Sequence, residues 1–104
     1  MEDYIMHLDS QEKLAVKRAP IGNITMDDYD FTIEAYCVPE KRITLTKKDC
    51  IRKDANSYAF IIETNKLGVG KVIIRMIAQI PDGDFKSGYR QNVDRVCTKY
   101  EIRR

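Results

Sequence analysis

The side chains that most often carry catalysis or bind metals are few in this chain. The only histidine is His7, and the three cysteines are Cys37, Cys50 and Cys97. A general base needs a nucleophile or a carboxylate within reach, and a zinc site needs several ligands at short spacing. No C-x-x-C pair occurs. We therefore predict no catalytic residue, no metal site and no cofactor, and we interpret the thiols as small apolar side chains. Whether Cys37 and Cys97 meet across the fold is left open by their spacing.

Two short motifs resemble ligand-binding loops only in part. Residues 68–71 (GVGK) look like a phosphate-binding turn, but that fingerprint opens a helix, and here an apolar strand-like run follows. Acidic residues cluster at 27–30 and at 82–84, without the twelve-residue loop and closing glutamate of a calcium site. We interpret the glycines as positive-φ residues of a hairpin, and the acids as ordinary turn residues.

Basic side chains gather around one polar segment. Pairs of Lys or Arg stand at residues 41–42 and 47–48, on either side of residues 43–46, and a third pair stands at 52–53. Such charge beside aromatic rings can bind single-stranded nucleic acid, and a polar face of this kind also suits a glycan. The net charge of only +2 argues against nucleic acid. The residues of this possible binding face are Tyr36, Arg42, Thr44, Thr46 and Lys48.

Apolar and polar residues alternate along the chain from residue 30 onward, which predicts half-buried strands. Residues 30–37 and 42–47 show this pattern, and residues 58–62 are apolar on both faces, as in a central strand. Residues 92–102 would place Val96, Tyr100 and Ile102 on one face. The longest apolar stripe consists of Val72, Ile74, Met76, Ala78 and Ile80.

Turn-forming residues separate these segments at 38–41, 54–57, 65–70 and 81–84. The first 23 residues are less regular: residues 4–8 and 14–17 suit short strands, whereas residues 11–17 also suit one or two helical turns. About seven short strands with regular turns are typical of an antiparallel β-sandwich of the immunoglobulin type. We therefore expect an all-β chain whose 104 residues form one domain.

The ends and the composition predict a place of synthesis. The N-terminus opens acidic, with no positively charged region before an apolar stretch, so we expect no signal peptide. No apolar run has the roughly 20 residues of a membrane helix. An odd number of widely spaced cysteines favours a reducing compartment. We expect synthesis in the cytoplasm and no membrane partner.

The C-terminal three-quarters of the sequence contains motifs that resemble a known family. Asp-Phe at 30–31, LGVGK at 67–71, IPDGDF at 80–85 and GYR at 88–90 are similar to small prophage-type proteins of gut anaerobes. More broadly, they resemble the immunoglobulin-like domain of phage baseplate upper proteins. The resemblance implies scaffold roles: Gly68 and Gly70 in a hairpin, and a turn motif around the start of the last strand made of Pro81, Asp82, Asp84, Phe85, Gly88 and Arg90. Ser87 replaces the Asp that is usual in the family.

These patterns predict a structural or assembly module and not an enzyme. The resemblance implies a prophage-derived virion or tail/baseplate-type component that contacts other protein chains, either further copies or a tail or fibre subunit. Strand addition at an exposed sheet edge is one route to such contacts. Residues 4–8 are a candidate for such a strand, docking in cis or in trans. The alternative is a module that binds glycan or single-stranded nucleic acid on an outer strand face.

Overall fold

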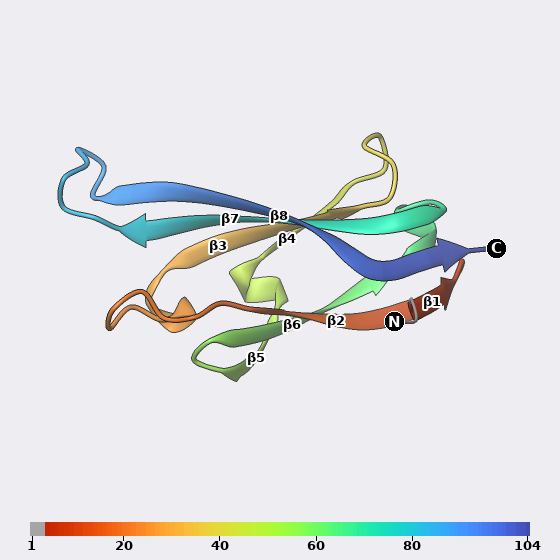
Figure 1. The fold of residues 1–104 in the computed structure, drawn as a ribbon, viewed down its shortest axis with the longest axis horizontal. Coiled ribbons are helices and arrows are strands. Elements are labelled where there is room, and N and C mark those ends of the chain that lie inside the picture. Colours follow the sequence, from red (N-terminus) through yellow and green to blue (C-terminus); the bar gives the residue numbers. More distant parts are fainter. Residues whose placement is uncertain (1–3) are drawn as a thin grey trace.

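The computed structural model describes residues 4–104, which form eight strands in two facing sheets (Figure 1). No helix in this part of the chain is long and apolar enough to cross a membrane. The three short 3-10 helices are η1 (Met26–Asp28), η2 (Lys47–Asp49) and η3 (Thr64–Lys66). The strands are β1 (Tyr4–His7), β2 (Gln11–Lys17), β3 (Asp30–Tyr36), β4 (Ile43–Thr46), β5 (Ile51–Asp54), β6 (Ser57–Glu63), β7 (Gly70–Pro81) and β8 (Tyr89–Arg103).

The strand order is that of an immunoglobulin-like sandwich. One sheet has the order β1-β8-β7-β3-β4 and the other the order β2-β6-β5. After β2, the chain passes between the sheets in pairs of strands, with β3 and β4 in the larger sheet, β5 and β6 in the smaller one, and β7 and β8 in the larger one again. This arrangement confirms the predicted fold class. The structure adds two details: β1 pairs with β8 in parallel, and β7 and β8 are long, with 12 and 15 residues.

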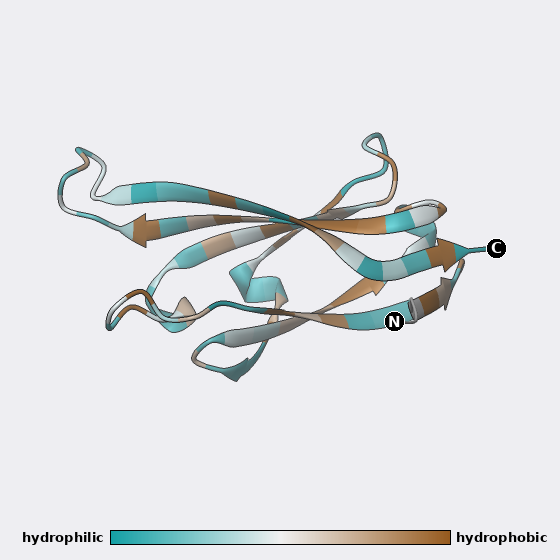
Figure 2. Cartoon of the chain, viewed as in Figure 1, coloured by the Kyte–Doolittle hydropathy of each residue, from teal (hydrophilic) through white to brown (hydrophobic). Residues whose placement is uncertain are grey.

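Alternation along the strands builds the core between the sheets. All five residues of the predicted stripe on β7 are buried, and so are Phe31, Ile33 and Ala35 on the neighbouring β3. The facing sheet contributes Phe60 and Ile62 from its central strand, both fully buried. Figure 2 shows hydrophobic segments along the strands of both sheets and hydrophilic residues at many of the bends. Period-two burial therefore fixes which face of each strand looks inward.

The N-terminal segment forms two strands. Residues 11–17 pair with β6 as an antiparallel strand, so the helical alternative for them is wrong. Strand β1 docks in cis, with Tyr4 opposite Tyr100 and His7 opposite Arg103. A buried hydroxyl fixes the corner between the two strands: Thr64 Oγ1 donates to the His7 carbonyl at 2.8 Å and accepts from the Ser10 amide at 2.9 Å.

The glycine-containing connection at residues 67–70 joins the two sheets. Gly68 and Gly70 have φ of 85° and 132°, so the predicted positive φ is confirmed. The predicted hairpin is wrong, because β6 and β7 lie in different sheets and do not pair. A Cβ on Gly68 would lie 3.4 Å from Val38 Cγ2, so the crossover also packs closely against the turn that follows β3.

The turn motif before the last strand closes a hairpin between β7 and β8. The Asp82 amide donates to the Gly88 carbonyl at 2.9 Å, and the Gly88 amide donates to the Phe85 carbonyl at 2.9 Å. Asp82 Oδ1 accepts from the Asp84 amide at 3.1 Å, which is an Asx turn. Arg90 lies 4.0 Å from the Asp82 carboxylate, Pro81 ends β7, and Phe85 is 47% exposed at the tip.

Candidate functional site

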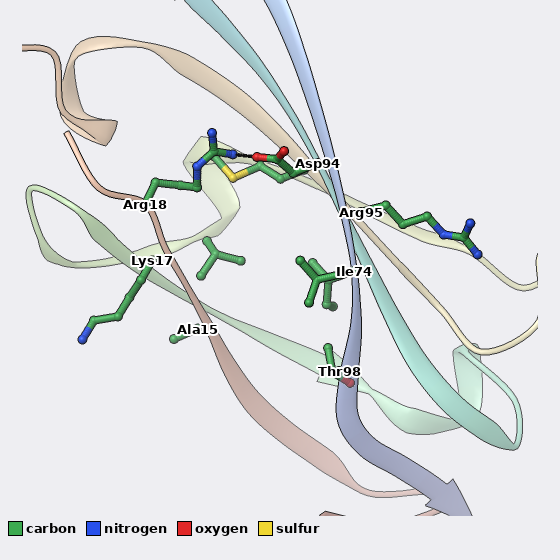
Figure 3. A pocket seen from close by; sticks show the side chains of 10 residues that line it. Ala15, Lys17, Arg18, Ile74, Asp94, Arg95 and Thr98 are labelled. Atoms are coloured by element: carbon green, nitrogen blue, oxygen red, sulfur yellow. Dashed lines mark hydrogen bonds and ion pairs between the residues drawn. The ribbon is translucent and has the colours of Figure 1, made fainter. Parts of the chain in front are cut away.

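The sandwich is incompletely closed along one side, between the edge strand β2 and strand β8. A cavity of about 360 Å³ lies there, which we call the seam (Figure 3). Its lining includes Val16, Ile74 and Met76 at the base and Val96 at the rim, so it is largely apolar. The immunoglobulin fold places a first strand beside its second one at this side, whereas here the first strand lies on β8.

An ion pair spans the seam. The Arg18 guanidinium, from the residue that directly follows β2, donates to Asp94 on β8, and Figure 3 shows the two side chains meeting across the gap. The Arg18 side chain is 24% exposed and that of Asp94 46%. The Arg18 amide donates to the Asn56 carbonyl at 3.0 Å, which anchors its backbone to the β5–β6 turn. Lys17 and Arg95 point away from the gap.

Strand β8 has an unpaired edge above the seam. On the side of β8 that faces away from β7, strand β1 pairs only with residues Tyr100 to Arg103. No described strand pairs with this side of β8 over residues 89–98. A bulge separates the two parts: Thr98 Oγ1 donates to the Val72 carbonyl at 2.7 Å and accepts from the Tyr100 amide at 3.2 Å. Val96 lies on the predicted inward face but is 55% exposed, because it borders the open seam.

The predicted binding face lies on the outer side of β3, β4 and the adjoining turn. Tyr36 is buried at 6% exposure, and the Arg42 guanidinium lies 4.4 Å from its ring centroid. Arg42 also donates to Glu34 at 3.2 Å, and Glu34 accepts from Arg75 at 2.8 Å. The ring of Tyr36 is thus covered by the chain's own cation, which leaves little aromatic surface for a ligand to stack on.

The three remaining residues of that face are all exposed. Thr44 lies on β4, and Lys48 lies on η2 beyond its end. Thr46 caps η2, since its amide and its hydroxyl both donate to Asp49 Oδ2, at 2.9 and 3.1 Å. The binding role of this face stays a prediction.

The acidic cluster at 27–30 forms part of a hydrogen-bond network that no pattern in the sequence indicates. Asp27 accepts from Arg52 Nε at 2.9 Å and from the Tyr58 hydroxyl at 2.5 Å. These hydrogen bonds, that of Arg52 first, lower the pKa of Asp27 to about 2, and burial together with Asp27 raises the pKa of Tyr58 to about 12. Lys47 Nζ donates to the carbonyls of Asp27 and Tyr29, at 3.0 and 2.9 Å. The network holds η1 against β5 and β6.

The three thiols are free, so Cys37 and Cys97, whose contact the spacing left open, form no disulfide. Cys37 follows β3 and donates to the Gly70 carbonyl at 3.4 Å, and burial raises its pKa to about 11. Cys97 is exposed on β8, opposite Ile73 on the outer face. His7 is exposed, and among residues 4–104 no three His, Cys, Asp or Glu side chains cluster closely enough to hold a metal ion.

Comparison with known proteins gives no relative: no family model, no curated protein and no solved structure matches the chain. The class that the fold and the site define is an immunoglobulin-like β-sandwich with an open edge. The resemblance to prophage-type and baseplate proteins stays a prediction.

Proposed function

We propose that this protein is a non-enzymatic assembly module that binds another protein chain by strand addition to β8. The observation that carries the proposal is the edge of β8 over residues 89–98, which no strand among residues 4–104 covers and which lies directly above a largely apolar seam. An exposed edge presents unpaired N–H and C=O groups, which a partner strand can satisfy. No step of covalent chemistry is required for this function.

The other edges of the sandwich are poorer templates for pairing. Strand β4 has four residues and continues into η2, and β5 has four exposed residues and an irregular register with β6. Strand β2 carries Lys13 and Lys17 on its outward face, and lysine on an edge opposes edge-to-edge pairing. The free part of β8 is longer than any of these, and it carries no lysine from residue 89 to residue 98.

The seam supplies side-chain selectivity for an added strand. Successive side chains of a strand point to opposite faces, so every second side chain of a partner strand beside β8 would face the seam. Val96 at the rim, with Ile74 and Met76 below it, offers these side chains an apolar surface. Main-chain hydrogen bonds then give affinity, and contacts of these side chains with Val96 and with the Arg18–Asp94 pair of the seam select which strand binds.

The prophage-type resemblance would make the partner a virion, tail or fibre subunit, or a further copy of this chain. Site-specific photo-crosslinking tests the proposal. A benzophenone amino acid replaces Val93, which is 42% exposed on the free edge, or Val69, which is 42% exposed in the β6–β7 connection. In cells that naturally produce the protein, we expect covalent adducts with a protein chain from position 93 and none from position 69. Adducts of equal yield from both positions, or none from position 93, would refute strand addition at β8.

A further inference from the structure

We infer that the chain bound at the β8 edge is a second copy of this protein, paired antiparallel about a two-fold axis through Val93. The inference rests on the proposed function and specifies its partner. Its basis is the register that the residues of the edge itself permit. Two identical edges form a symmetric contact when each strand offers the same pattern to the other.

The sandwich geometry restricts the registers. Residues directly opposite each other in an antiparallel pair point to the same face of the sheet. The inner faces of both copies must stay on one side if the two five-stranded sheets are to form one continuous sheet. The two-fold axis then passes through one residue of β8, which faces its own copy, and not between two residues.

Strand β1 sets a limit at one end. It occupies the edge from Tyr100 onward among the described residues. An axis at Arg95 would bring Tyr89 of the second copy opposite Glu101, within the part of the edge that β1 covers, and it would also set two guanidinium groups face to face. This register is therefore excluded on two counts.

Charge excludes the next register. An axis at Asp94 would place two carboxylates directly opposite each other, and like charges in that position destabilise a sheet. An axis at Val93 is the next choice, and it pairs residues 89–97 of each copy, a longer stretch than a typical strand of about 5–6 residues. Moving the axis to Asn92 shortens the pairing and removes Val96 and Cys97 from it.

With the axis at Val93, no opposed pair brings like charges together, and Arg90, which lies 4.0 Å from the Asp82 carboxylate, lies opposite Val96. The two Val93 side chains, each 42% exposed, cover one another on the outer face. Gln91 lies opposite Arg95, and Asn92 lies opposite Asp94, where the amide can donate to the carboxylate that Arg18 also binds. A single contact thus pairs the main-chain groups of both edges and covers both exposed valines.

This register makes a specific covalent prediction, because Cys97 of one copy lies opposite Tyr89 of the other. Opposed residues in an antiparallel pair have Cα separations of about 4.5–5.5 Å, which suits a disulfide. Under mild oxidation, Tyr89→Cys should give a disulfide-linked dimer through the native Cys97, and Tyr89→Cys with Cys97→Ser should not. Gln91→Cys places its thiol opposite Arg95 and should remain monomeric on a non-reducing gel. Equal cross-linking of the Tyr89→Cys and Gln91→Cys variants would refute the register.

Light scattering tests the association itself. The unmodified protein should show twice the 12.1 kDa mass of one chain, Val93→Lys should lose the dimer, and the equally exposed Val69→Lys should keep it. A wild-type protein that stays monomeric refutes the inference. If that monomer still gives adducts with a different chain from position 93, only the second copy is wrong and strand addition stands. If position 93 gives no adduct at all, the proposed function fails as well.

Discussion

Phe31 offers the sharpest test of how the core is held together, because three phenylalanines of this chain occupy different environments. Phe31 is 1% exposed and forms two edge-to-face ring pairs, with Tyr58 at 5.1 Å between centroids and with Tyr29 at 6.4 Å. Each such pair contributes about 0.5–1.5 kcal/mol beyond the area that it buries. Phe31→Leu keeps an apolar side chain but removes both pairs, so about 1–3 kcal/mol of pair energy should be lost.

Two matched variants isolate this term. Phe60 is also fully buried but forms no aromatic ring pair within the described part of the chain, so Phe60→Leu reports the common cost of a smaller side chain in the core. Phe85 is 47% exposed at the β7–β8 turn, and Phe85→Leu should change stability little. We expect Phe31→Leu to lower the free energy of unfolding by about 1–3 kcal/mol more than Phe60→Leu does.

Urea unfolding followed by circular dichroism measures these differences. The slope of free energy against urea should be the same in all four proteins, since an altered slope would report a changed unfolded state. For a domain of this size each kcal/mol corresponds to a shift of about 4–8 °C in Tm, which thermal unfolding checks independently. If Phe31→Leu and Phe60→Leu lose equal free energy, the ring pairs contribute nothing and the reasoning is refuted.

Three further predictions concern other parts of the molecule. The guanidinium and hydroxyl that Asp27 binds lower its pKa to about 2. The contribution of Asp27 to stability is therefore present above about pH 4 and is lost as the pH falls to 2. The difference in urea midpoint between wild type and Asp27→Asn should be largest at pH 7 and shrink between pH 4 and pH 2. Gly88 has a φ of 82°, so Gly88→Ala should cost about 1–2 kcal/mol in chemical denaturation, whereas Gly83→Ala, which has open space and no positive φ, should be near neutral. Of the thiols, exposed Cys97 should react with a chromogenic disulfide reagent well before Cys37, whose pKa is raised to about 11, and equal rates would contradict the described burial.

From residue 30 onward, the local pattern of the sequence was sufficient to predict the main strands and the core between them. The alternation of residues 72–80 identified the buried face of β7 because a strand has only two faces, and a one-residue shift would expose the whole stripe. The same argument identified β3 and the central position of β6. The turn at 82–88 could also be predicted, because aspartate and glycine adopt its backbone conformations with little loss of free energy.

The candidate site could not be predicted from the sequence, because it depends on how strands that are distant in the chain are placed. Residues 4–8 suit a strand equally well beside β2 or beside β8, and only the folded chain shows that β1 lies beside β8. The Arg18–Asp94 pair joins residues far apart in the chain, and no local pattern marks either one. Asp27 was interpreted as an ordinary turn residue because its partners are also distant in the chain. In the folded chain, η1 lies where Asp27 accepts hydrogen bonds from Arg52 and Tyr58.

Which side chains face inward follows from the residue pattern, because burial with period two is a property of each strand alone. Which strands became neighbours, and therefore which edge no strand among residues 4–104 covers, was settled only when the whole domain folded. Strand pairing is a contact between distant segments, and its choice among similar edges depends on the free energy of the whole sandwich. The fold class could thus be predicted from the residues, whereas the free edge of β8 could be found only in the folded chain.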